Sequence, residues 1–107
     1  SEGPFAEPAM RLSLIIRPEA EADLAEAKDW YERQRQGLGL EFVLSVEEAL
    51  DRIRRMPHVH AEIYKGVRRS ATRRFPYGVY YRLTGESVTV IAVMHSRRDP
   101  RRWQERV

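Results

Sequence analysis

Arginine is the residue type that gives the C-terminal part of this chain its chemistry. Residues 67–107 hold ten arginines and no lysine, against only three acidic residues, although the net charge of the 107-residue chain is only +3. Guanidinium groups bind carboxylates and phosphates through paired hydrogen bonds, which an ammonium group does not do. The arginine bias therefore predicts a surface that engages an acidic or polyanionic macromolecule.

One histidine lies among these arginines. His95 precedes Ser96, Arg97 and Arg98, and histidine changes its charge near neutral pH. Flanked by two guanidinium groups, it could serve as a general acid or base at a phosphodiester. The alternative, which we favour, is a histidine at the end of a strand, bonded to nearby backbone or to Asp99. Asp99 itself is expected to tie the C-terminal tail to the sheet through an arginine.

Other reactive patterns are weaker. Metal ligands on one face of a strand alternate in sequence, as do His58, His60 and Glu62. An ordinary polar loop explains these residues, and we predict no metal site. Ser96 adjoins His95 without the Gly-x-Ser-x-Gly turn of a serine nucleophile. The sequence has no cysteine, which excludes disulfides and thiolate sites. No cofactor is expected.

The first half of the chain predicts one strand and two helices. Residues 11–17 alternate as a strand does, with Leu12, Leu14 and Ile16 on one face. Pro18 then begins a helix that is expected to reach about Gln34, with apolar residues at helical spacing. Two glycines near residue 38 reverse the chain, and a second amphipathic helix follows until Pro57 forbids its continuation.

The second half predicts three strands. Residues 57–66 read as a connecting loop, and residues 67–74 and 77–83 as strands. Residues 84–87 form a turn, and the almost wholly apolar residues 88–94 predict a strand that is covered on both faces and central in the sheet. The basic residues 97–107 form a tail. The fold class is therefore α+β, in the order β-α-α-β-β-β, with a helical hairpin packed on one face of a mostly antiparallel twisted sheet.

The chain organisation is simple. Residues 1–9 are interpreted as a tag remnant or a flexible arm before a natural start at Met10, and residues 10–107 as a single domain. No run approaches the roughly 18 apolar residues of a membrane span. We expect a cytoplasmic protein without a membrane partner.

The order of these motifs resembles the RelE/ParE toxin superfamily, the toxins of type II toxin–antitoxin modules, often called plasmid stabilisation proteins. The landmarks are Asp23-Leu24, Trp30-Tyr31-Glu32, Gly37-Leu38-Gly39, Phe42, Pro57, Val67-Arg68-Arg69, Phe75-Pro76-Tyr77, Tyr80-Tyr81, His95-Ser96-Arg97-Arg98-Asp99-Pro100 and Trp103. Each is weak alone, and their order and spacing carry the resemblance.

The resemblance implies one of two activities. ParE-like members inhibit DNA gyrase, whereas RelE-like members cut mRNA on ribosomes and carry a cation after the first aromatic residue of the third-strand motif, where this chain has Gly78. RelE-like members also carry a tyrosine or a histidine–tyrosine pair near the C-terminus, where this chain has Trp103, and indole is no acid or base near neutral pH. Both departures favour the ParE-like branch.

The expected roles follow from this choice. For a gyrase inhibitor we expect no catalytic residue, target contacts from Arg97, Arg98, Arg101, Arg102 and Trp103, and antitoxin contacts from Trp30, Arg68, Arg69, Arg73, Arg74 and Tyr80. The expected partners are DNA gyrase and a ParD-like antitoxin whose acidic tail folds on the toxin. Direct nucleic-acid binding is secondary. The alternatives are an mRNA endoribonuclease that uses His95, Arg97 and Arg98, and an inactive binding module that retains the fold.

Overall fold

The computed structural model describes residues 12–107. The interpretation of residues 1–9, the start at Met10 and the first residue of the predicted strand 11–17 therefore lie outside the described residues. Within residues 12–107, no helix is both long and apolar enough to cross a membrane.

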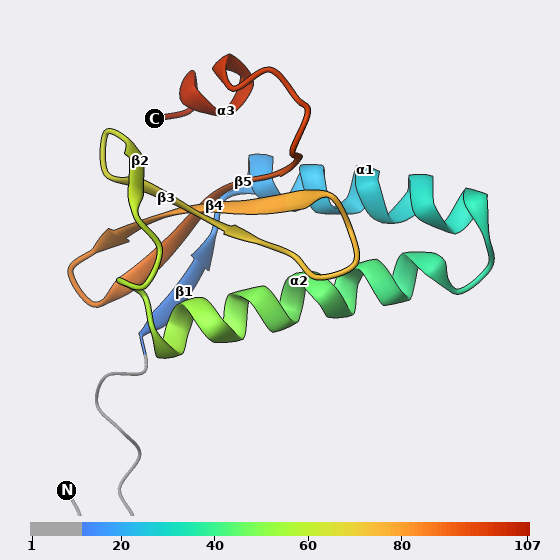
Figure 1. Cartoon of the computed structure of the whole chain (residues 1–107), viewed down its shortest axis with the longest axis horizontal. Helices are drawn as coiled ribbons and strands as arrows, with labels where there is room; N and C mark the ends of the chain where they lie inside the picture. The colour runs from blue at the N-terminus through green and yellow to red at the C-terminus, as the bar shows by residue number, and fades with distance from the viewer. Residues whose placement is uncertain (1–11) are drawn as a thin grey trace, which may run out of the picture.

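The described chain forms a sheet with helices on its two faces (Figure 1). The elements in chain order are β1 (Ser13–Ile16), α1 (Pro18–Gln34), α2 (Leu38–Arg55), β2 (Glu62–Tyr64), β3 (Val67–Ala71), β4 (Tyr77–Thr84), β5 (Ser87–His95) and α3 (Arg101–Gln104). The helices α1 and α2 form an antiparallel hairpin along one side of the sheet, and α3 lies above the other side. The predicted α+β class and helical hairpin are confirmed.

The sheet runs in the order β1-β5-β4-β3-β2. Its pairs are antiparallel except β1 with β5, which is parallel. The helical hairpin carries the chain from β1 at one edge of the sheet to β2 at the opposite edge, and β5 then returns beside β1 in the same direction. The apolar strand β5 lies inside the sheet, although β4 rather than β5 is its middle strand.

Two predictions for the second half of the chain are wrong. The segment 57–66 was expected to be a loop but contains β2, a three-residue edge strand that pairs with β3. The tail 97–107 also contains the short helix α3. Neither element has enough residues to show a hydrophobic period, so pattern alone does not reveal them.

The predicted strand 67–74 ends early, at Ala71. The Thr72 hydroxyl donates to the carbonyls of Phe75 (2.9 Å) and Tyr77 (3.3 Å), which closes a tight turn. Arg74 has a positive φ of 72° in this turn. Arg73 and Arg74 consequently lie in a loop beside α2 rather than on the sheet.

The sharp reversal between α1 and α2 depends on a carboxylate and a glycine. The two oxygens of Glu32 accept hydrogen bonds from the backbone N–H groups of Gly37 and Gly39, each at 3.0 Å. These bonds satisfy donors at the start of α2, and they hold the pKa of Glu32 below its usual value. A Cβ on Gly39 would lie 2.8 Å from the carbonyl oxygen of Lys28, so the two helices approach closely here.

The protein has an apolar cluster on each face of the sheet. The larger one lies under the helical hairpin and is built around edge-to-face and stacked rings of Tyr31, Phe42, Phe75 and Tyr77, with centroids 4.9–6.0 Å apart. The smaller one lies under α3 and contains Val67, Tyr80, Ile91, Ala92, Met94 and Trp103. Burial on both faces explains why residues 88–94 of β5 are almost all apolar.

A buried tyrosine and a histidine connect the α2–β2 segment to the sheet. Tyr81 is fully buried, and its hydroxyl donates to the carbonyl of Pro57 at 2.9 Å. Because that proton is already committed, the hydroxyl oxygen accepts from Nδ1 of His60 at 3.2 Å. Burial, with smaller contributions from Arg52 and Arg68, lowers the pKa of His60. The structure therefore pairs His60 with Tyr81, and Glu62 pairs with Arg68 at 3.4 Å.

The lowered pKa of His60 predicts an acid-sensitive contribution to stability. The folded state binds this proton less readily than the unfolded state, so the contribution is fully present above the unfolded pKa of about 6.5 and is lost as the pH falls through the folded pKa. We expect His60→Gln to lose less stability than the unmodified protein between pH 7.5 and pH 5, as measured by urea unfolding at both pH values. Equal losses in the two proteins would contradict this role for His60.

Candidate functional site

The C-terminal tail is anchored to the sheet by Trp103. Its indole stacks on Tyr80 with a centroid distance of 4.7 Å and meets Tyr64 edge-on at 5.8 Å. Trp103 is 4% exposed and Tyr80 is 6% exposed. Both were expected to contact partners, but in this structure they support the surface from below. The basic residues around α3 are therefore displayed on a packed base.

A second anchor joins the end of the tail to α1. Arg106 donates two hydrogen bonds to the carboxylate of Asp23, at 2.6 and 3.1 Å, and Asp23 also accepts the backbone N–H of Val93 at 3.0 Å. This bidentate pair raises the pKa of Arg106. Arg17 donates to the carbonyl of Arg106 at 2.8 Å. The tail is thus fixed to α1 and β5 by a charge pair that is largely shielded from solvent.

Asp99 does not tie the tail to the sheet as predicted. It accepts the backbone N–H of Arg101 at 3.0 Å and pairs with the Arg101 guanidinium at 2.7 Å, which holds the pKa of Asp99 below its usual value. The contact is local because the two residues are separated by one position. Asp99 organises the start of α3, and the expected long-range contact is made instead by Asp23 and Arg106.

Seven of the eight predicted arginines fall into two groups, and the eighth, Arg69, donates to the Tyr80 hydroxyl. Four of them pair with acidic residues of their own chain: Arg68 with Glu62, Arg73 with Glu48, Arg74 with Glu41, and Arg101 with Asp99. By contrast, the exposed side chains of Arg97, Arg98 and Arg102 form no hydrogen bond or ion pair within residues 12–107. The uncommitted guanidinium groups, Arg97, Arg98 and Arg102, define what we call the tail surface.

His95 lies on the helix-covered side of the sheet. Its ring meets Tyr77 edge-on at 5.4 Å, and its Nδ1 accepts the backbone N–H of Arg97 at 3.0 Å. The backbone contact is the one favoured from the sequence, with Arg97 as the donor. Of the predicted ribonuclease set, His95 and Arg98 line the same pocket.

Gly78 has no side chain, but the guanidinium group of Arg69 lies next to it. A Cβ at this position would lie 2.8 Å from Cζ of Arg69, whose guanidinium crosses over Gly78 from the neighbouring strand. Arg69 donates to the Tyr80 hydroxyl at 3.1 Å. Because Tyr80 packs under α3 whereas Tyr77 packs under the hairpin, Arg69 and His95 lie on opposite faces of the sheet. The cation near Gly78 is therefore separated from the histidine by the sheet.

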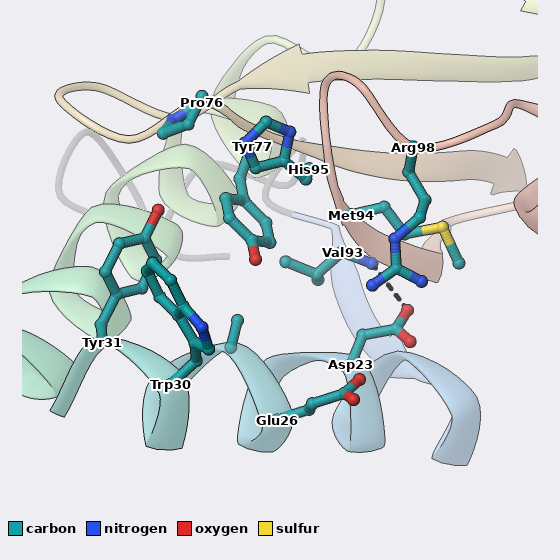
Figure 2. Close-up of a pocket in the computed structure, with 11 residues that line it drawn as sticks. Asp23, Glu26, Trp30, Tyr31, Pro76, Tyr77, Val93, Met94, His95 and Arg98 are labelled. Atoms are coloured by element: carbon teal, nitrogen blue, oxygen red, sulfur yellow. Dashed lines mark hydrogen bonds between the residues drawn. The ribbon is translucent and has the colours of Figure 1, made fainter. Parts of the chain in front are cut away.

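A pocket of about 530 Å³ lies between α1 and the ends of β4 and β5. Figure 2 shows Trp30 and Tyr31 on one side of it, Arg98 on the other and Tyr77 between them. Trp30 remains 50% exposed at the rim. Burial raises the pKa of the Tyr77 phenol, so this group stays neutral near pH 7. The pocket thus combines aromatic walls with one uncommitted guanidinium.

The sequence interpretation missed the Asp23–Arg106 pair and the pocket. In the sequence Asp23 stood out only as part of the landmark Asp23-Leu24, and Arg106 only as one of the basic residues of the tail. Nothing in the spacing of 83 residues between them signals a contact. The aromatic residues did carry a signal, because Trp30 lies beside the core stripe of α1.

The comparisons with known proteins agree on one family. Residues 14–100 match the family model described as the ParE toxin of the type II toxin–antitoxin system parDE. Toxin ParE2 of Mycobacterium tuberculosis is 30% identical over 92 residues, which cover 85% of this chain and 88% of that protein.

Solved structures show the same fold. A chain of the chromosomal ParDE toxin–antitoxin system from P. aeruginosa superposes with a TM-score of 0.71 at 21% identity, over 81% of this chain and 98% of that one. A chain of the RelBE2 toxin–antitoxin complex of Mycobacterium tuberculosis gives 0.57 at 20% identity, over 79% and 98%. At these identities the structural matches show only that the fold is shared. The family assignment rests on the family model and on the 30% identical relative. This chain belongs to the ParE toxin family of type II toxin–antitoxin systems.

Proposed function

We propose that this toxin inhibits DNA gyrase and that a cognate antitoxin neutralises it. The observation that carries the proposal is the tail surface, in which the guanidinium groups of Arg97, Arg98 and Arg102 are exposed and unpaired within the described chain while Trp103 and Arg106 hold their backbone in place. A rigid display of unpaired guanidinium groups suits docking on an acidic protein surface, because few side chains must be ordered on binding.

The distribution of titratable groups supports docking rather than catalysis. A ribonuclease needs an acid or base and a cation on the same side of the scissile phosphate. Here His95 and Arg69 lie on opposite faces of the sheet. Arg74, a further cation of the predicted set, pairs with Glu41 at 2.9 Å.

The runner-up, an mRNA endoribonuclease, has one observation in its favour. His95 and Arg98 line one pocket, and Tyr77 lies between the helix and both of them. A phosphate entering this pocket would meet a guanidinium and an imidazole together. This arrangement keeps the second activity as the main competitor to gyrase inhibition.

The related toxins support an antitoxin as a partner of this chain. The two structural relatives come from a ParDE system and from a RelBE2 toxin–antitoxin complex. The present chain offers uncommitted cations and an open aromatic pocket, which suit a partner that carries acidic and apolar residues. Several predicted antitoxin contacts, such as Arg73 and Arg74, would have to exchange their internal partners for those of the antitoxin.

Induction of the toxin in growing cells separates the two activities. A gyrase inhibitor is expected to leave a reporter plasmid progressively less negatively supercoiled after induction, as seen on chloroquine gels, while mRNA remains intact. A ribonuclease would instead produce codon-positioned cuts detectable by primer extension, and His95→Ala would abolish them. Normal growth with normal plasmid supercoiling and intact mRNA would leave only the third alternative, an inactive binding module that retains the fold.

A further inference from the structure

The pocket beside α1 has the composition of a protein-binding socket. Its lining includes the apolar side chains of Ala27 and Val93 and the ring of Tyr77, together with Trp30, which is half-exposed. A half-exposed tryptophan next to a cavity leaves a large apolar surface in water. Tryptophan is also the residue type most enriched among energetically dominant interface residues.

The charges around the socket limit what can enter it. The carboxylate of Asp23 is neutralised by Arg106 and by the backbone N–H of Val93. Glu26 and Arg98 remain as uncompensated charges within the described residues, on different sides of the opening in Figure 2. A partner with an acidic group near Arg98 gains a charge-assisted bond, whereas one with an acidic group near Glu26 is repelled.

We propose that this socket receives one large apolar side chain from an acidic segment of the antitoxin, and that a carboxylate next to that side chain pairs with Arg98. The inference rests on the proposed neutralisation by an antitoxin and adds the place and chemistry of the contact. The volume of about 530 Å³ falls within the range of pockets that enclose ligand groups of roughly 300–1,000 Å³. The apolar side chain supplies affinity, and the charges on either side set the direction of the segment.

The socket also implies how neutralisation works. Arg98 belongs both to the socket and to the tail surface. An antitoxin carboxylate bound to Arg98 would remove this guanidinium from contact with gyrase. The antitoxin therefore competes with the target for Arg98 and needs no rearrangement of the toxin fold.

The test measures binding of the antitoxin encoded with this toxin by isothermal titration calorimetry, using the full-length toxin. Trp30→Ala and Arg98→Glu are each expected to raise the Kd roughly tenfold or more, because they remove a socket wall and reverse its charge. The matched controls are Ile63→Ala and Lys65→Glu at the opposite end of the sheet. Ile63 is 50% exposed, as Trp30 is, and neither control residue lines the socket. Both controls should stay within about twofold of the unmodified Kd.

The outcomes separate this inference from the proposed function. Unchanged binding by both socket variants, with tight binding by the unmodified toxin, would overturn the socket and leave neutralisation by the antitoxin intact. No binding by the unmodified toxin would overturn both. Circular dichroism checks that Trp30→Ala is folded. Arg98→Glu alters an exposed side chain that makes no hydrogen bond or ion pair within the described residues, so it decides the matter even if Trp30→Ala does not fold.

Discussion

Replacing Arg97 and Arg98 together by alanine is expected to weaken gyrase inhibition roughly tenfold or more while leaving the protein folded. The two guanidinium groups are exposed and make no bond within the described chain, so their removal costs the fold little. Their loss removes two of the three unpaired cations of the tail surface. The measurement is the toxin concentration that halves supercoiling by purified gyrase.

The matched control removes two arginines elsewhere. Arg33→Ala combined with Arg55→Ala also removes two positive charges. These two side chains are exposed and lie in the last turns of α1 and α2. This control should inhibit gyrase at the concentration of the unmodified toxin. If the Arg97/Arg98 variant is folded and equally inhibitory, the tail surface is not the target contact.

Asp23→Ala is expected to lower the free energy of unfolding by about 2–3 kcal/mol and to weaken inhibition as well. The change leaves Arg106 as a poorly solvated charge without its partner and leaves the backbone N–H of Val93 without its acceptor. The side chains of Asp23 and Arg106 are only 14% and 21% exposed, so water replaces the lost contacts poorly. Because the pair also fixes the tail, the tail surface should lose its rigid base. Urea unfolding measures the first effect and the supercoiling assay the second.

Two further variants identify the cause of that loss. Glu26→Ala removes an exposed carboxylate one turn along α1 and should change stability by less than about 0.5 kcal/mol. Asp23→Ala combined with Arg106→Met removes the stranded charge and should be less destabilised than the sum of the single changes. Additive losses would show that the two residues act independently.

Much of the fold was accessible from the sequence because long elements repeat their hydrophobic pattern several times. The start of α1 at Pro18, its end at Gln34 and the apolar strand β5 are examples. The short elements β2 and α3 were not accessible, since three or four residues cannot display a period. Their positions depend on tertiary contacts, such as the stacking of Trp103 on Tyr80.

The candidate site was predictable in composition but not in geometry. The arginine bias pointed to the tail, yet only the structure separates Arg97 and Arg98, which are unpaired among the described residues, from Arg73 and Arg74, which bind acids of α2. Gly78 itself carries no cation, as the sequence shows, but the neighbouring strand brings Arg69 across the glycine. Contacts between distant positions on a folded sheet leave no mark in the local sequence pattern.

Supercoiling of a relaxed plasmid by purified gyrase, with the toxin added in increasing amounts, tests gyrase inhibition most directly. The proposed function predicts that supercoiling stops near one toxin per gyrase complex and that adding the antitoxin restores it. Supercoiling that continues at a large excess of folded toxin, together with codon-positioned mRNA cleavage on ribosomes, would contradict gyrase as the target and leave His95 and Arg98 as the residues of a ribonuclease.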